Sequence, residues 1–229
     1  PKPAVTFYNL YFNLLEILTH IRHSENVFNM RKFLLILILT LSFQSWTKAD
    51  DIRDFEIEGM SIGDSALDFF TKKEIKNKIN SYNDNGYIYN SRKFYSLTFY
   101  DNQKYKTYEA VQIIFKDKDK RYKIHSIAGI NYYKSDINDC YNQMEIIEKE
   151  LDSIFNNSKK KEFIKRKHPY DETGKSTTND VYYILSNSDT ASIHCYDWLQ
   201  SEFIKIPDQL NVTFNTSEFN DFLDYEAYN

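Results

Sequence analysis

The residues most able to bind a metal ion are His194 and Asp197, which are three positions apart. A metal site needs several His, Cys, Asp or Glu side chains that converge. No second histidine lies at ligand spacing from His194, and side chains three apart on a strand point to opposite faces of the sheet. We therefore expect no metal site and no cofactor.

Two further motifs match only part of a catalytic signature. Gly63-Asp64-Ser65 is similar to the nucleophile block of GDS-type esterases, which also need an acidic residue shortly before a catalytic histidine. The residues three positions before His125, His168 and His194 are Tyr122, Lys165 and Ala191, none of them acidic. Gly174-Lys175-Ser176-Thr177 ends like a phosphate-binding loop, but Pro169 occupies the place of its first glycine. We expect a helix cap at Ser65 and a polar turn at the second motif.

A basic cluster, Lys165, Arg166 and Lys167, is a candidate anion-binding site. It follows Lys159–Lys161 in a chain that is acidic overall. Its cations could bind a phosphate or carboxylate group. The alternative is that the first lysines follow the end of a helix, where cations are favourable, and that the rest lie on a solvated strand.

An aromatic row, His194, Tyr196 and Trp198, is a candidate binding face. These residues alternate with Ile193 and Cys195, so they share the other side of the strand. On an exposed sheet face, such a row would bind a sugar or a peptide. The same row could equally pack beneath the last helix.

The elements that position these residues predict an α+β fold. Apolar residues recur every three or four positions in residues 136–156, which indicates a helix with one buried stripe. Runs of aromatic and β-branched residues between short polar turns indicate antiparallel strands. Helices are expected at 62–70, 72–80, 136–156 and from Ser217, and strands at 94–100, 108–115, 122–130, 180–185, 191–198 and 210–214. The expected fold is an antiparallel sheet built from two helix-plus-meander halves, with the helices packed on one face.

Residues 30–49 have the order of a secretory signal peptide. Met30-Arg31-Lys32 supplies a start and positive charge, Phe33–Phe43 is an uncharged apolar core, and Thr47-Lys48-Ala49 precedes the cleavage site. The apolar core is shorter than the ~20 residues that span a bilayer. The alternative is a buried core helix. Residues 1–29 are expected to be an upstream segment outside the native protein, or else a genuine N-terminal extension.

Composition and charge limit the class of partner. The chain has 229 residues, 41% of them hydrophobic and few of them Gly or Pro, which excludes disordered and collagen-like classes. Residues 1–49 carry five of the 29 basic and two of the 33 acidic residues, so residues 50–229 have a net charge of -7. This acidic mature part is expected to form one α+β domain without a membrane span. Its charge argues against nucleic acid as a partner.

The two cysteines, Cys140 and Cys195, are predicted to form a disulfide. Cys140 falls on the apolar stripe of the predicted helix, and Cys195 shares a strand face with Ile193. Export would bring both residues to an oxidising compartment, in which two cysteines of one small domain usually pair. The Cα atoms of a bridged pair should lie within about 7 Å. The alternative is two buried thiols.

Two segments carry a resemblance. Glu56–Ser65 (EIEGMSIGDS) and His194–Trp198 (HCYDW) resemble a group of uncharacterised exported proteins of AT-rich marine alphaproteobacteria. This resemblance covers most of residues 50–229 and implies no function. Gly59-Met60-Ser61, ahead of a helix, is also weakly similar to the small two-helix, three-strand lipoproteins of outer-membrane assembly.

These patterns predict an exported, non-catalytic binding or interaction module. It would be periplasmic or extracellular, with an unknown envelope or extracellular partner. Two alternatives remain open. One is an exported hydrolase with an unrecognised site, and the other is a small-ligand binder that uses His194, Tyr196 and Trp198.

Overall fold

The computed structural model describes residues 51–81, 89–101, 103–133, 136–168, 171, 173–199 and 206–227. The predicted upstream segment (1–29) and signal peptide (30–49) lie outside the described residues. Within the described ranges, no helix is long and apolar enough to cross a membrane.

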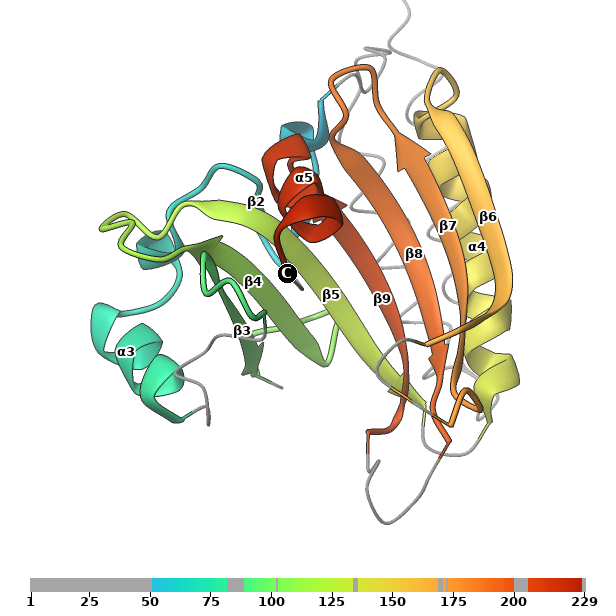
Figure 1. Cartoon of the computed structure of the whole chain (residues 1–229), viewed down its shortest axis with the longest axis horizontal. Helices are drawn as coiled ribbons and strands as arrows, with labels where there is room; N and C mark the ends of the chain where they lie inside the picture. The colour runs from blue at the N-terminus through green and yellow to red at the C-terminus, as the bar shows by residue number, and fades with distance from the viewer. Residues whose placement is uncertain are drawn as a thin grey trace, which may run out of the picture. The chain divides into compact units, whose positions relative to one another are not determined.

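A seven-stranded antiparallel sheet organises the chain (Figure 1). Its strands are β3 (Phe94–Tyr100), β4 (Ala110–Lys116), β5 (Ile124–Tyr133), β6 (Lys159–Lys167), β7 (Thr177–Ile184), β8 (Thr190–Asp197) and β9 (Asp208–Asn215). They lie in the order β3-β4-β5-β9-β8-β7-β6. The last strands of the two meanders, β5 and β9, therefore pair with each other at the centre of the sheet. The predicted α+β class and antiparallel sheet are confirmed.

The second meander has one strand more than the sequence predicts. Lys159–Lys167 forms the edge strand β6. The solvated strand that the sequence offered as an alternative for Lys165–Lys167 is present, but it begins earlier, at Lys159, where lysines after a helix end were expected. All residues of β6 except Lys160 are exposed, and the strand lacks the run of aromatic and β-branched residues by which the other strands are predicted.

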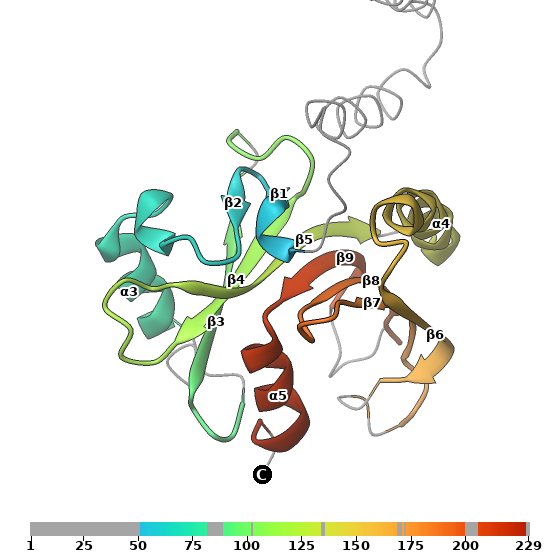
Figure 2. The same ribbon diagram turned by 90° about the horizontal axis from the view of Figure 1, so that it is seen from above.

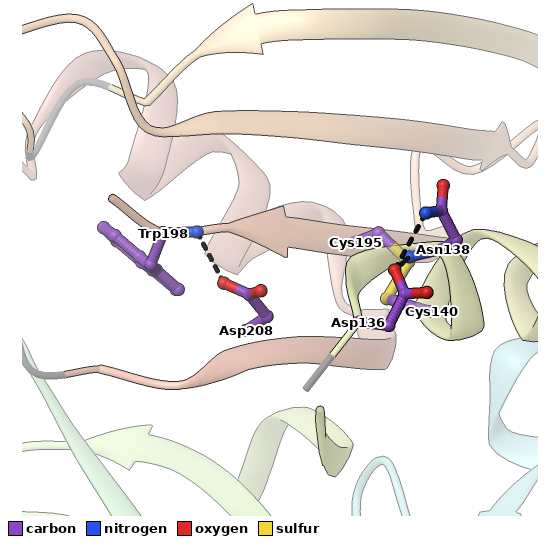
Figure 3. The surroundings of a disulfide bond; sticks show 6 residues. All are labelled: Asp136, Asn138, Cys140, Cys195, Trp198 and Asp208. Carbon is purple, nitrogen blue, oxygen red and sulfur yellow. Dashed lines mark hydrogen bonds between the residues drawn. A yellow bond between two sulfur atoms is a disulfide. The ribbon is translucent and has the colours of Figure 1, made fainter. Parts of the chain in front are cut away.

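Helix α4 (Ile137–Ile154) covers one side of the sheet. Asp136 caps its first turn, and the predicted apolar stripe is buried against β8 and β9. The stripe comprises Cys140, Met144, Ile147 and Leu151. Cys140 and Cys195 form a disulfide with a Cα–Cα distance of 6.0 Å, as predicted (Figure 3). Disulfides are typical of oxidising, extracytoplasmic compartments.

Helix α5 (Ser217–Tyr225) packs on the opposite side, so the expectation that the helices share one face is wrong (Figure 2). Its Phe219 and Phe222 form a second small core with Phe94 and Ile114. Adjacent strand residues point to opposite faces, and Ile113 lies in the main core while Ile114 lies under α5. Both sides of β3 and β4 are therefore apolar near α5.

The region before β3 is less helical than predicted. Two short strands, β1 (Glu56–Ile57) and β2 (Met60–Ser61), form a hairpin between the 3-10 helices η1 (Ile52–Asp54) and η2 (Ala66–Asp68). Ser65 caps η2 by accepting a hydrogen bond from the Leu67 N–H, which confirms its capping role. Its hydroxyl donates to the Arg121 carbonyl. Helix α3 (Lys72–Ser81) begins after a capping box, in which Thr71 and Glu74 bond to each other's backbone N–H groups.

Glu58, in the β1–β2 turn, holds a distant loop. Its carboxylate accepts hydrogen bonds from the backbone N–H groups of Lys106, Thr107 and Tyr108, at 2.9, 2.7 and 2.9 Å. Three donors are thus satisfied by one charged acceptor, and hydrogen bonds to charged groups contribute more than neutral ones.

We expect Glu58→Ala to lower the free energy of unfolding by about 2 kcal/mol, because these N–H groups lose their acceptor. Urea unfolding measures the change. Glu56→Ala, which removes an exposed carboxylate from β1, is the matched control and should change stability little. Equal losses of unfolding free energy in the two variants would show that the three hydrogen bonds to Glu58 do not stabilise the fold.

Candidate functional site

The candidate site is the side of the sheet that faces α5, toward the viewer in Figure 1. Two rows of side chains cross it, as the strand registers show. One row is Thr98, Gln112, Ala128, Thr213, Ser192 and Tyr182, and the other is Tyr100, Ala110, Ile130, Asn211, His194 and Asp180. We call these two rows the polar face. They differ from the α4 side, whose residues form the apolar main core.

Asp180 is the centre of a buried hydrogen-bond network on the polar face. One carboxylate oxygen lies 2.8 Å from His194 Nδ1. The other accepts a 2.8 Å hydrogen bond from the Thr178 hydroxyl and pairs with Arg166 at 2.8 Å. Burial acts to raise the pKa of Asp180, but the contacts with His194, Thr178 and Arg166 outweigh burial and hold this pKa below its ordinary value. Asp180 is therefore an ionised carboxylate whose charge is compensated.

The same network contains the elements of a Ser–His–Asp relay. His194 contacts Asp180 through Nδ1 and lies 2.9 Å from Ser192 Oγ through Nε2. In hydrolases this arrangement lets the histidine take a proton from the serine. Here Ser192 is only 1% exposed, and strand β8 is paired on both sides, with Tyr182 and Thr213 as the neighbours of Ser192. The main chain around Ser192 is therefore committed to the sheet rather than to an oxyanion hole.

The predicted aromatic row of His194, Tyr196 and Trp198 lies together in the structure, but His194 and Trp198 are buried. The rings of His194 and Tyr196 lie 5.8 Å apart, and those of Tyr196 and Trp198 stack at 6.0 Å. His168 packs 4.3 Å from the Trp198 ring, and Trp198 is buried. Burial lowers the pKa of His168, so this ring is neutral at neutral pH. Tyr196 is the member of the row that stays partly exposed.

Asp208 holds the C-terminal end of β8, next to the aromatic row, in place. Its carboxylate accepts a 2.8 Å hydrogen bond from the Trp198 backbone N–H, next to the disulfide (Figure 3). The disulfide lies on the other side of β8, since Cys195 alternates with His194 and Tyr196. One strand therefore joins the covalently fixed core to the polar face.

Asn211 adds an unsatisfied group to the polar face. It lies between His194 on β8 and Ile130 on β5 and is only 9% exposed. Within the part of the chain that the structure describes, its Oδ1 has no hydrogen-bond partner. An unpaired buried acceptor costs about 1–3 kcal/mol. The Oδ1 atom is almost fully enclosed by its neighbours, as is the Ser192 side chain.

The three residues of the basic cluster have different partners in the structure. Arg166 pairs with Asp180 inside the network. The Lys165 backbone N–H donates to Asn179 Oδ1 at a bulge of β6, and the Lys167 side chain lies against Gly174. The described residues also contain no group of three metal-binding side chains.

Sequence reasoning predicted a face of His194, Tyr196 and Trp198 but did not predict Asp180, Ser192 or Asn211 as site residues. Ser192 is two positions from His194, so alternation places it on the same face. Asp180 and Asn211 come from neighbouring strands, and only the strand register brings them beside His194.

Comparison of the chain with protein-family models, curated proteins and solved structures finds no match.

Proposed function

We propose that the chain is an exported, non-catalytic binding module and that the polar face holds its ligand. The observation that carries this proposal is a sheet face of polar side chains around a buried, unpartnered acceptor on Asn211. Burying polar groups is costly, so a face that served packing alone would be as apolar as the α4 side. A polar ligand would satisfy Asn211 and remove this cost.

The chemistry of the polar face favours an uncharged, hydrogen-bonding ligand. Asp180 is the acid of the face, and its charge is compensated by Arg166. The remaining polar side chains are hydroxyls, amides, tyrosine rings and the His194 imidazole, with Ala110, Ala128 and Ile130 between them. Such a surface suits a neutral sugar or an uncharged extended peptide.

Amide NMR spectra of the ¹⁵N-labelled protein, titrated with neutral oligosaccharides and with short uncharged peptides, test this function. We expect shifts centred on His194, Tyr196 and Asn211 with one of the two panels. Asn211→Leu should abolish the shifts, whereas Asn77→Leu on the exposed surface of α3 should not. Shifts elsewhere, or no shifts with either panel, would overturn the proposal.

Export is supported by the Cys140–Cys195 disulfide and by the order of residues 30–49. Expressed in a bacterium from Met30, the protein should be cut between Ala49 and Asp50, because small residues precede this bond. N-terminal sequencing of the exported product measures the cleavage point. A mature protein that still begins at Met30 would contradict export by this signal.

A hydrolase is the second candidate, favoured by the Ser192–His194–Asp180 relay. We expect no turnover above background with ester, glycoside, peptide and phosphoester substrates, because Ser192 is buried within a paired strand. Ser192→Ala should therefore behave as the wild type, as should Ser65→Ala. Turnover that is lost in Ser192→Ala or in His194→Asn would show that the protein is an enzyme.

A further inference from the structure

We propose that the free edge of β6 docks an extended acidic segment of a partner protein by adding a strand to the sheet. Arg166 of β6 pairs with Asp180 of the polar face, and the lysines of β6 argued below are not part of that network. It rests on three features of β6: its position, its unpaired cations and its exposed apolar residues.

The position of β6 at one end of the sheet leaves one side of its main chain without a partner among the described strands. It is the last strand of the seven, and eight of its nine residues are exposed. Lys159–Phe163 pairs residue by residue with β7, which keeps this stretch regular. The register then shifts before Arg166, and Lys165 takes a positive φ of 50°. Lys159–Phe163 is therefore the part of the edge that can accept another strand.

Charge decides which kind of strand fits. Lys160 is already paired with Glu148, Asp152 and Glu162. The other lysines of β6 make no ion pair with any described residue. They are Lys159, Lys161, Lys165 and Lys167. Four lysines without an ion pair among the described residues lie along one strand, and they attract an acidic segment and repel a second copy of β6.

Two apolar residues favour a polypeptide over another polyanion. Ile164 is 76% exposed and Phe163 is 41% exposed. An added strand would cover such side chains and bond to the free main-chain groups of β6. A sulfated or phosphorylated polymer would use the lysines alone.

Binding of a fluorescent ten-residue peptide of alternating Glu and Val tests the proposal. We expect Lys161→Glu/Lys165→Glu to weaken binding about tenfold or more, because two attractions become repulsions. Lys73→Glu/Lys76→Glu, on the exposed surface of α3, makes the same change in net charge and should bind like the wild type. Thermal unfolding checks that both variants are folded.

The same peptide with N-methyl groups at alternate residues keeps its charge but loses main-chain donors. We expect it to bind at least tenfold more weakly than the unmodified peptide. Equal binding of the two peptides, no binding of either, or equally lysine-dependent binding of dextran sulfate would overturn strand addition. Asn211→Leu should leave peptide binding unchanged, which separates this test from that of the polar face.

Discussion

Replacing both cysteines with alanine, Cys140→Ala/Cys195→Ala, should lower the free energy of unfolding by about 4 kcal/mol. The disulfide closes a loop with a sequence separation of 55 residues, which restricts the unfolded chain. The chain-entropy relation gives ~4 kcal/mol for a loop of this length. This is a large part of the ~5–15 kcal/mol that stabilises a typical domain.

Urea unfolding at equilibrium measures the loss. Both cysteines are buried, so alanine also removes sulfur atoms from the core. Wild-type protein unfolded in the presence of a reductant keeps these atoms and separates the cross-link from packing. If reduction leaves the urea midpoint unchanged, the disulfide does not stabilise the fold.

Replacing the buried carboxylate, Asp180→Ala, should cost about 3 kcal/mol of unfolding free energy. His194 and Thr178 would lose their partner inside the sheet, and breaking a buried pair leaves groups that water cannot reach. The Arg166 side chain is about half exposed, so solvent screens its share of the loss. Asp221→Ala, on the exposed side of α5, is the matched control and should be nearly neutral.

The pH dependence of stability provides a second readout for Asp180. Its pKa is lower in the folded protein than the ordinary value of 3.8, so the folded state favours the ionised form. The resulting stabilisation is complete above about pH 4 and is lost as the pH falls through the folded pKa. Asp180→Asn should remove this part of the acid sensitivity. An unchanged acid limb of the stability curve in Asp180→Asn would contradict the assignment.

The polar face and the β6 edge assign different partners to different surfaces. Under the two proposals, the polar face offers hydroxyl, amide and imidazole groups around Asn211, whereas β6 offers lysines that pair with no described residue, in a chain of net negative charge. A module with both surfaces could hold a neutral ligand while it is attached to an acidic partner. Asn211→Leu and Lys161→Glu/Lys165→Glu separate these two roles.

Local patterns determined most of the elements and one long-range contact. The spacing of apolar residues predicted α4, and runs of aromatic and β-branched residues between polar turns predicted β3, β4, β5, β7, β8 and β9 to within a few residues. The same patterns placed Cys140 and Cys195 on apolar faces, and the disulfide followed from their facing each other. These features are readable because the period of a helix or a strand determines which side chains share a face.

Only the tertiary structure decided the full extent and pairing of β6, the position of α5 and the network around Asp180. A solvated edge strand has no buried side, so its sequence lacks the alternation that marks a strand. The apolar residues of α5 required a core but did not specify which side of the sheet supplied it. Asp180, His194 and Asn211 meet because three strands pair in one register, and a shift by one residue would send each side chain to the opposite face.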